Sequence, residues 1–380
     1  MLSLLKIVGK IAWLKRLPLW RPILGYVFIS TAVIIGCLQV MALPLWPMSK
    51  SFYRRVAASL SHPLLLFCVW VAAEWGNIVI RVFGDKTGLD CAGKEPGLYV
   101  LNHPGDADFL CGVMLAYEFN ILTTLKAIVK KSLMFVPGLG IIFYANEYMF
   151  LDRKWSTDQP KMTAMIKQSQ TFPYPISFIL FCEGTRFTKD IQAKRLEYAR
   201  SKGLPELQHH LIPKTKAFSS MVLGMKDAAC SPALYDVELA FPRGEPSILS
   251  VLEGRPSEVH IHIRRIPMSE IPSSEAELDD YCHTLYQEKD KLLCEYYQKG
   301  KFNASEYERE GKLRRKILSH LNALFWGCIT MFPPSLLALK LAADASWLLL
   351  SLPIGLFLFV TVTFEVTLRQ GMKEFKVKKS

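Results

Sequence analysis

Short apolar runs that end in polar turns recur through the middle of the chain, and segments with helical periodicity separate them. Such runs are typical of buried strands, and they occur at residues 78–83, 98–101, 176–181, 237–241, 248–252 and 259–263. Patterns that predict helices occur at 106–119, 159–172, 190–202 and 275–298. This alternation predicts an α/β fold in which helices flank a mixed sheet. In the last strand apolar residues alternate with His260 and His262, so we expect both histidines at the surface.

Longer uncharged runs near both ends predict membrane segments. Residues 22–48 contain no charged residue, and they exceed the roughly 20 apolar residues that a helix needs to cross a bilayer. Runs at 321–339 and 345–368 predict a helical hairpin, with Pro333-Pro334 kinking its first arm. The run at 63–80 contains Glu74, so we expect an interfacial or domain-packed helix there.

These runs divide the chain into three parts. We expect an N-terminal membrane anchor at 1–60, a globular domain at 61–300, and a C-terminal transmembrane hairpin with a basic tail at 301–380. Basic residues flank the first uncharged run on both sides, which leaves open whether that segment crosses the bilayer or dips into one leaflet.

The net charge of +12 indicates a partner with negative charge. The basic residues gather beside the apolar runs, where they fit anionic lipid headgroups, and no recognition motif for nucleic acid accompanies them. The nine cysteines are scattered without the spacing of metal ligands, so we expect free thiols and no metal. The basic residues concerned are Lys6, Lys10, Lys15, Arg16, Arg21, Lys312, Arg314, Arg315, Lys316, Arg369, Lys373, Lys376, Lys378 and Lys379.

Two polar motifs directly follow predicted strands. The first, at 102–109, places His103 five residues before Asp108; the second, at 181–188, contains Glu183-Gly184-Thr185-Arg186. Open α/β sheets place their sites at strand ends, so both motifs should meet at one edge of the sheet. A histidine oriented by an acid is typical of a general base, and arginine is typical of a phosphate site. Taken singly, the first motif could be a surface histidine with a helix-capping aspartate, and the second a turn.

Together with other segments, these motifs resemble the 1-acyl-sn-glycerol-3-phosphate acyltransferases (lysophosphatidic acid acyltransferases) of the long, membrane-bound eukaryotic type. The similarity covers roughly residues 50 to 300. One departure is Pro104-Gly105, where family members usually carry bulkier or polar residues. The further matching segments are Lys130-Lys131-Ser132-Leu133, Val136-Pro137-Gly138-Leu139-Gly140, Glu147-Tyr148-Met149-Phe150-Leu151-Asp152-Arg153, Leu211-Ile212-Pro213-Lys214-Thr215-Lys216-Ala217-Phe218 and Pro232-Ala233-Leu234-Tyr235-Asp236.

The resemblance implies a glycerolipid acyltransferase-like fold and transfer of a fatty acyl group from acyl-CoA to the sn-2 hydroxyl of lysophosphatidic acid. His103 would act as the general base and Asp108 would orient it. Arg186 would bind the phosphate of the acceptor, with Glu183 orienting Arg186 or its loop. No cofactor is expected, because acyl-CoA is a co-substrate. The supporting residues of the phosphate site would be Gly184, Thr185, Arg153 and Lys131.

Two other functions fit the same motifs: acylation of another lysophospholipid or of dihydroxyacetone phosphate, and a non-catalytic role in shaping membranes. The tail at 376–380 resembles a lysine-based endoplasmic-reticulum retrieval signal, and basic residues flank the predicted hairpin on both sides. We therefore expect a multi-pass protein of the endoplasmic reticulum membrane whose site faces the cytosol. The sequon Asn303-Ala304-Ser305 lies on that side and should stay unmodified.

Overall fold

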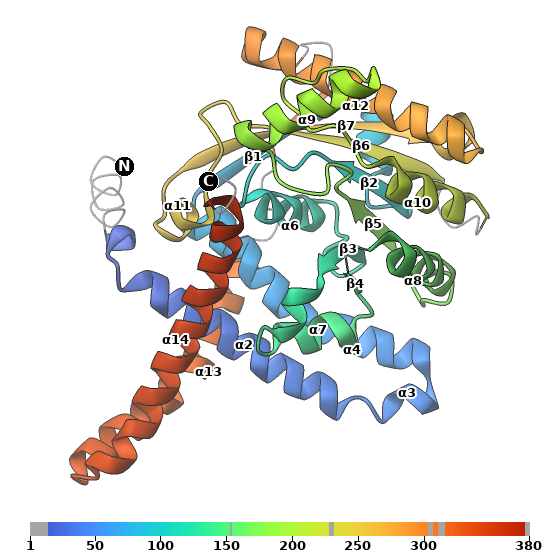
Figure 1. Cartoon of the computed structure of the whole chain (residues 1–380). Helices are drawn as coiled ribbons and strands as arrows, with labels where there is room; N and C mark the ends of the chain where they lie inside the picture. Colours follow the sequence, from blue (N-terminus) through green and yellow to red (C-terminus); the bar gives the residue numbers. More distant parts are fainter. Residues whose placement is uncertain (1–13, 153, 228–231, 303–306, 311–315, 377–380) are drawn as a thin grey trace.

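An eight-stranded mixed sheet forms the centre of the molecule (Figure 1). The computed structural model describes residues 14–152, 154–227, 232–302, 307–310 and 316–376. The strand order is β4-β3-β5-β2-β6-β7-β1-β8; the strands from β4 to β6 are parallel, β7 is antiparallel to β6, β1 is parallel to β7, and β8 is antiparallel to β1. The mixed α/β fold is thus confirmed. The strands are β1 (Ile78–Gly84), β2 (Gly97–Leu101), β3 (Leu125–Lys130), β4 (Met149–Leu151), β5 (Ser177–Leu180), β6 (Ala233–Ala240), β7 (Ser257–Pro267) and β8 (Tyr307–Glu310).

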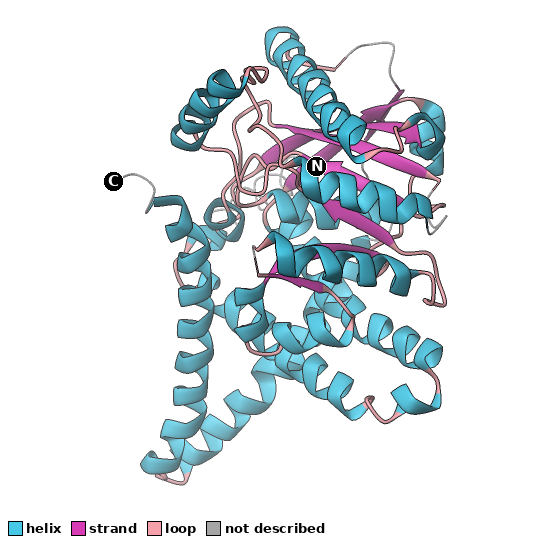
Figure 2. Cartoon of the chain, turned by 45° about the vertical axis from the view of Figure 1, so that its right-hand side comes forward, coloured by secondary structure: helices cyan, strands magenta, loops and turns pink. Residues whose placement is uncertain are grey.

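Helices cover both faces of this sheet (Figure 2). One face carries α8 (Trp155–Ser169), α10 (Thr215–Asp227) and α12 (Glu275–Lys299). The other face carries α6 (Asp108–Glu118), which lies between the sheet and the N-terminal helices. The other helices are η1 (Leu14–Arg16), α2 (Trp20–Met41), α3 (Leu45–Met48), α4 (Lys50–Trp70), η2 (Val71–Trp75), α5 (Lys86–Cys91), η3 (Lys131–Phe135), α7 (Leu139–Ala145), α9 (Lys189–Lys202), α11 (Ile248–Leu252), η4 (Met268–Glu270), α13 (Lys316–Ala343) and α14 (Trp347–Lys376).

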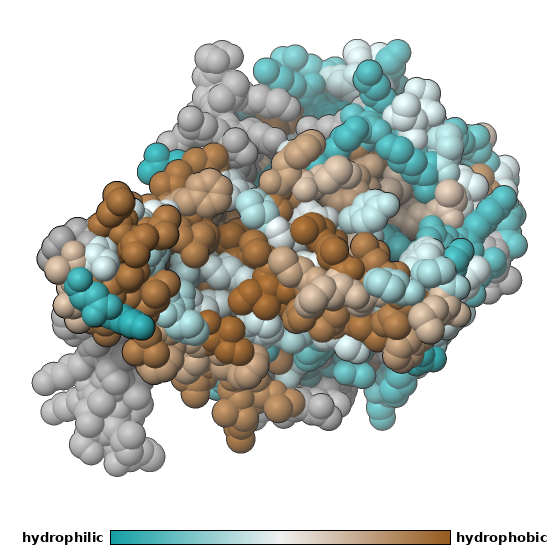
Figure 3. Space-filling view, turned by 90° about the horizontal axis from the view of Figure 1, so that it is seen from below, coloured by the Kyte–Doolittle hydropathy of each residue, from teal (hydrophilic) through white to brown (hydrophobic). Residues whose placement is uncertain are grey.

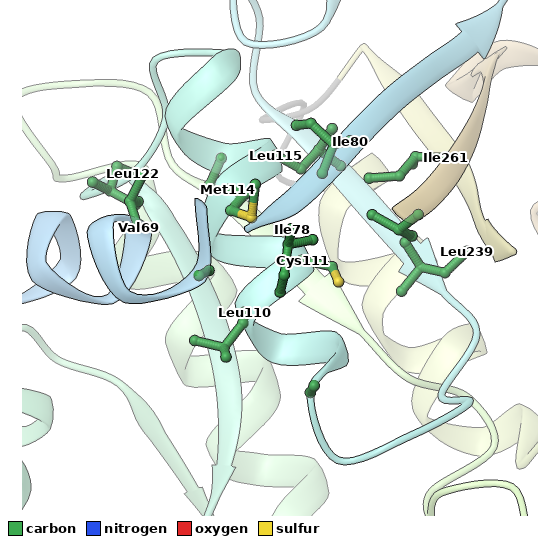
Figure 4. Close-up of a cluster of buried hydrophobic side chains, with 14 of the residues drawn as sticks. Val69, Ile78, Ile80, Leu110, Cys111, Met114, Leu115, Leu122, Leu239 and Ile261 are labelled. Carbon is green, nitrogen blue, oxygen red and sulfur yellow. The ribbon is translucent and has the colours of Figure 1, made fainter. Parts of the chain in front are cut away.

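Alternation along β2 supplies side chains to both sides of the core. Tyr99 and Leu101 belong to the cluster beneath α6, whereas Leu98 and Val100 belong to the cluster beneath α8 and α10. Figure 4 shows the first of these clusters, in which side chains of α6 meet those of β1, β6, β7 and the end of α4. Because both faces are covered, the whole of β2 is buried, which explains why it reads as an unbroken apolar run.

One expected strand is a helix. Residues 248–252 form α11, because the side chain of Ser247 caps its first turn: Ser247 Oγ accepts the Ser250 N–H at 3.0 Å, and Ser250 Oγ accepts the Ser247 N–H at 2.9 Å. A short apolar run cannot by itself distinguish a buried strand from a buried helical turn.

The expected exposure of two histidines is also wrong, since His260 and His262 are only 9% and 8% exposed. Their strand β7 lies inside the sheet, between β6 and β1. The end of α12 covers the polar face of β7: Tyr296 Oη lies 2.9 Å from Nδ1 of His260, and the ring of Phe302 lies 5.2 Å from that of His262.

Among the described residues, four helical segments are long and apolar enough to cross a membrane, but they pack differently. They are Trp20–Met41 in α2, Lys50–Trp75 across α4 and η2, Ile317–Ala343 in α13 and Leu348–Arg369 in α14. The apolar windows of the first two are 56% and 50% buried within the protein, whereas those of the hairpin arms are 11% and 6% buried. The predicted C-terminal hairpin is present and projects away from the sheet, with its turn near Asp344 (Figure 1). The helix expected from residue 63 begins at Lys50, with Pro63 inside it.

The underside of the molecule is largely apolar (Figure 3). Exposed apolar side chains occur in the region from α2 to α4, in η3 and in α7. They are Val40, Met41, Leu43, Met48, Phe52, Met134, Phe135, Ile141 and Tyr144. An apolar face of this extent is typical of a surface that meets lipid or another protein.

A glycine contact joins α2 to the segment that leads from β3 into α7. Gly138 has a φ of +73°, and a Cβ atom there would lie 2.3 Å from the carbonyl carbon of Ala32 in α2. Gly36, one turn further along α2, approaches the carbonyl oxygen of Gly138 in the same way, at 3.3 Å from its own Cβ position. Only glycine fits at position 138, because the positive φ and the close approach both exclude a side chain.

A buried ion pair fixes α4 to the sheet domain. Arg54 is 4% exposed and donates from Nε and Nη2 to both carboxylate oxygens of Glu147, at 2.7 and 2.9 Å. Its Nη1 donates to the carbonyl of Thr171 at 2.7 Å, and its guanidinium lies 3.9 Å from the ring centre of Phe172. One side chain therefore connects α4 with the turn before β4 and with the end of α8.

We predict that Arg54→Ala lowers the melting temperature of the detergent-solubilised protein clearly. Removing one partner of a buried pair costs about 3–5 kcal/mol, because the other charge stays buried without compensation. The neighbouring Arg55 is exposed and donates only to the carbonyl of Pro173, so Arg55→Ala is the matched control and should melt close to wild type. Equal melting temperatures for the two variants would contradict the role of Arg54.

Candidate active site

The two polar motifs lie side by side at one edge of the sheet. They follow β2 and β5, which are parallel neighbours with Val100 opposite Leu180. Both chains therefore leave the sheet at the same edge, as the sequence predicted.

His103 and Asp108 form a hydrogen-bonded pair. Nδ1 of His103 donates to Oδ2 of Asp108, whose side chain is 2% exposed. Asp108 is the first residue of α6, where the helix dipole favours a negative charge. The ring centre of the imidazole lies 4.6 Å from that of Phe181, with the planes tilted by 35°, and the side chain remains 21% exposed, so it can reach a substrate. An Nδ1–H bound to a carboxylate leaves Nε2 as the basic nitrogen, which suits proton abstraction from a hydroxyl.

Glu183 holds the backbone of His103. Its Oε1 accepts the His103 N–H at 3.0 Å, and its Oε2 accepts the Leu211 N–H at 3.2 Å. The His103 carbonyl in turn accepts the Phe187 N–H at 2.8 Å. Glu183 is 1% exposed; burial raises its pKa, and the charge of His210 with the two N–H donors partly offsets that rise. This carboxylate thus binds the loop itself.

The loop after β5 carries the other predicted phosphate-site residues. Gly184 has a φ of +66°, and its N–H donates to the Phe181 carbonyl at 3.1 Å. Thr185 and Arg186 follow and are partly exposed. Arg186 lies close enough to Asp106 to counteract the rise in the pKa of Asp106 that burial causes.

The last two predicted phosphate-site residues are placed differently. Lys131 follows β3, the neighbour of β5, and its Nζ binds Oδ1 of Asp152 at 2.7 Å. Its side chain is 57% exposed. Arg153 lies outside the described residues. Within the described ranges, no three histidine, cysteine or carboxylate side chains are arranged to hold a metal ion.

Comparison with known proteins identifies the family. The chain is 36% identical over 345 residues to 1-acyl-sn-glycerol-3-phosphate acyltransferase gamma of Pongo abelii, covering 90% of each chain. It is 35% identical over 321 residues to the delta enzyme of Homo sapiens, covering 84% of this chain and 83% of that one. Models of the acyltransferase family and of the acyltransferase C-terminus match residues 81–232 and 250–326.

The chain belongs to the 1-acyl-sn-glycerol-3-phosphate acyltransferase family. A solved structure that it matches is the 1-acyl-sn-glycerophosphate (LPA) acyltransferase PlsC of Thermotoga maritima, with 17% identity and a TM-score of 0.45. That match covers 72% of this chain and 95% of the solved one.

In this acyltransferase, two charged residues at the site escaped the sequence analysis. Glu245 follows β6, and its Oε2 lies 3.3 Å from the Cβ position of Gly105. Burial, together with the charges of Asp108, Asp106 and Glu183, raises the pKa of Glu245 to about 7. Because β6 is the other parallel neighbour of β2, the segment after it reaches the same edge of the sheet.

The second is Lys214, which the matching segment contains without assigning it a role. Its N–H donates to the Cys182 carbonyl at 2.7 Å, and its side chain lies 3.1 Å from the Cβ position of Gly184. The acyltransferase therefore brings the segment before α10, which carries Lys214, beside the loop after β5, which carries Arg186.

Proposed function

We propose that the protein transfers a fatty acyl group from acyl-CoA to the sn-2 hydroxyl of lysophosphatidic acid and so forms phosphatidic acid. The observation that carries this proposal is the His103–Asp108 pair, held beside a cationic loop at one edge of the sheet. The related proteins are named for a 1-acylated glycerol 3-phosphate. In that acceptor the sn-2 carbon bears the one free hydroxyl of the glycerol, so this hydroxyl is the one that can be acylated.

The chemistry requires one base and an activated acyl donor. Nε2 of His103 takes the proton of the hydroxyl, while Asp108 stabilises the imidazolium that forms. The oxygen attacks the thioester carbonyl, the carbon–sulfur bond breaks, and the departing thiolate takes the proton from the imidazolium. A thiol with a pKa of about 8.5 leaves readily, so neither a metal nor a bound cofactor is needed.

The tetrahedral intermediate needs a donor for its oxyanion. The Gly184 N–H is engaged with the Phe181 carbonyl at 3.1 Å, which favours the backbone near Gly105 for this role. Gly105 lies between His103 and Asp108 in the chain. An N–H there would donate to the oxyanion on the carbon that the activated hydroxyl attacks.

Arg186 binds the phosphate of the acceptor in this proposal, because its planar fork suits a phosphate better than a lysine does. Gly184 turns the loop with its positive φ so that the backbone N–H of Thr185 can reach the phosphate, and Glu183 keeps the loop in place. Lys131 supports the acceptor from the end of β3, and Arg153 is the further candidate that the family resemblance implies. Lys131 would exchange its bond to Asp152 for the phosphate.

The protein resides in the endoplasmic reticulum membrane with its site on the cytosolic side, where acyl-CoA is available. Basic residues on both flanks of the C-terminal hairpin and the lysine-containing tail support this orientation. Asn303 and residues 377–380 lie outside the described residues.

The general base is tested by His103→Ala, which should abolish transfer while the protein stays folded and membrane-bound. Asp108→Asn should lower kcat about 10⁴-fold, because it disturbs the tautomer that makes Nε2 basic. Release of coenzyme A is measured with purified protein, acyl-CoA and a panel of lysophospholipids. Release of coenzyme A by His103→Ala at a near wild-type rate would show that His103 is not the base. A preference for an acceptor without a free phosphate monoester would show that lysophosphatidic acid is not the substrate.

The phosphate site is tested by Arg186→Ala, which should raise the KM for lysophosphatidic acid about ten- to hundredfold. This corresponds to the 1.5–3 kcal/mol of a hydrogen bond to a charged group. The control is Arg200→Ala, since Arg200 pairs with Glu206 on exposed α9. An effect confined to the KM for acyl-CoA would move Arg186 to the donor site.

The topology is tested by glycosylation. We expect Asn303 to remain unmodified in cells, whereas an extended sequon-bearing loop inserted after Asp344 in the hairpin turn should be glycosylated. An endoglycosidase-sensitive mobility shift of the wild type that Asn303→Gln abolishes would overturn the cytosolic placement.

A further inference from the structure

A buried histidine behind the site has no part in the reaction as derived above. The side chain of His210 is fully buried, and each ring nitrogen faces a carboxylate: Nδ1 lies 3.0 Å from Oδ1 of Asp290, and Nε2 lies 3.0 Å from Oε1 of Glu238. The ring meets Tyr286 edge-on at 5.7 Å. The three polar side chains come from the loop before α10, from α12 and from β6.

Both carboxylates are already bound by other donors, which fixes their charge. Asp290 accepts the N–H groups of Gln208 and His209 at 2.8 and 2.7 Å. Oε2 of Glu238 binds Nζ of Lys289 at 3.1 Å. Two ionised carboxylates facing the two ring nitrogens require a proton on each nitrogen, so His210 is an imidazolium. Burial alone lowers the pKa of His210, but these carboxylates outweigh it and raise that pKa to about 10.

His210 is connected to the site through Glu183 in two ways. The next residue, Leu211, donates its N–H to Oε2 of Glu183 at 3.2 Å. The charge of the imidazolium also favours the ionised form of Glu183, which burial opposes. An ionised carboxylate offers two strong acceptor oxygens, whereas protonation turns one of them into a donor and a weak acceptor; Glu183 uses both oxygens to hold His103 and Leu211 at once.

We propose that His210 is a positioning residue for acyl transfer: its buried charge keeps Glu183 ionised, and ionised Glu183 holds the backbone of His103 at the site. The proposal rests on the proposed function, because acyl transfer is its readout. Without the imidazolium, Glu183 takes up a proton at higher pH. One of its oxygens then becomes a donor, and either the His103 or the Leu211 N–H loses its acceptor.

Several other ionisable groups surround the two residues and bear on the pH dependence. Those that face Glu183 are His210, Glu238, Glu245 and Tyr286, and those that face His210 are Glu238, Asp290, Glu183 and His209. Glu245 titrates near neutral pH and is the main competing source of a pH effect.

The test is the pH profile of kcat for purified full-length His210→Gln, measured from about pH 6 to pH 9. The glutamine can hydrogen-bond to Glu238 or Asp290 but carries no charge. The acid-side midpoint of the profile should move upward by at least about one pH unit, a tenfold change in proton concentration. Activity should recover toward the wild-type value at high pH. A loss by the same factor at every pH, or no loss, would overturn the proposal.

A second comparison separates action through Glu183 from general damage. In a Glu183→Gln background the titrating group is absent, so adding His210→Gln should change kcat less than about twofold. The same loss in both backgrounds would show that His210 does not act through Glu183. The shift should persist when Glu245→Gln is added to His210→Gln, and its disappearance would assign the titration to Glu245.

His260→Gln is the matched control. His260 is another buried histidine beside a carboxylate, with Nε2 3.2 Å from Glu258 and Nδ1 bound to Tyr296. His260→Gln should keep the wild-type midpoint. An equal shift in this variant would mean that the shift in His210→Gln comes from a general loosening of the fold. If His210→Gln does not fold, Asp290→Asn tests the same link. It removes a carboxylate that raises the pKa of His210, so the midpoint should again move upward, and an unchanged or lower midpoint contradicts the proposal.

These outcomes are distinct from failure of the proposed function. Wild-type protein that transfers no acyl group to lysophosphatidic acid would remove the proposed reaction. Active wild-type protein whose profile is indifferent to His210 would remove only the role of His210.

Discussion

The parallel pairing of β2 with β5 on one side and β6 on the other is the constraint on which the site depends. It brings three chain segments that are distant in sequence, beginning near residues 102, 181 and 241, to one edge of the sheet. Each segment contributes a carboxylate: Asp108 and Glu183 are buried, and Glu245 is exposed. Crowding of like charges is unfavourable unless donors face them, so backbone N–H groups, an imidazole and a buried histidine are arranged around this edge. The position of His103 therefore depends on the pairing of all three strands.

The same sheet separates two kinds of apolar surface. Beneath it, α2 and α4 bury about half of their apolar windows against protein, while α13 and α14 bury almost none. Protein contacts thus satisfy part of the hydrophobicity of the N-terminal pair, whereas the C-terminal hairpin must be covered by something outside the chain. Helices of similar composition consequently differ in role, because Arg54 and the Gly138 contact fasten one pair to the sheet.

Local pattern predicted the elements that have one dominant signal. The sequence alone predicted the buried strand β2, the pairing of His103 with Asp108, and the C-terminal hairpin. Where a pattern fits two structures, the deciding interaction lay in a neighbouring residue, as with Ser247 at α11, or in a distant one, as with Phe302 over His262. The roles of His210 and Glu245 could not be predicted, because they depend on residues distant in the sequence. The partners of His210 are 28 and 80 residues away, and no local pattern indicates them.

The contact at Gly138 limits how parts of this protein can be recombined. Since the backbone of α2 touches the backbone before α7, the first helix and the 136–140 segment form one module with a single shape. A chimera that exchanges residues 20–41 alone must bring a small residue opposite Gly138, or the helix is forced away from the domain. The two segments can be exchanged only together, although 94 residues (42–135) lie between them in the chain.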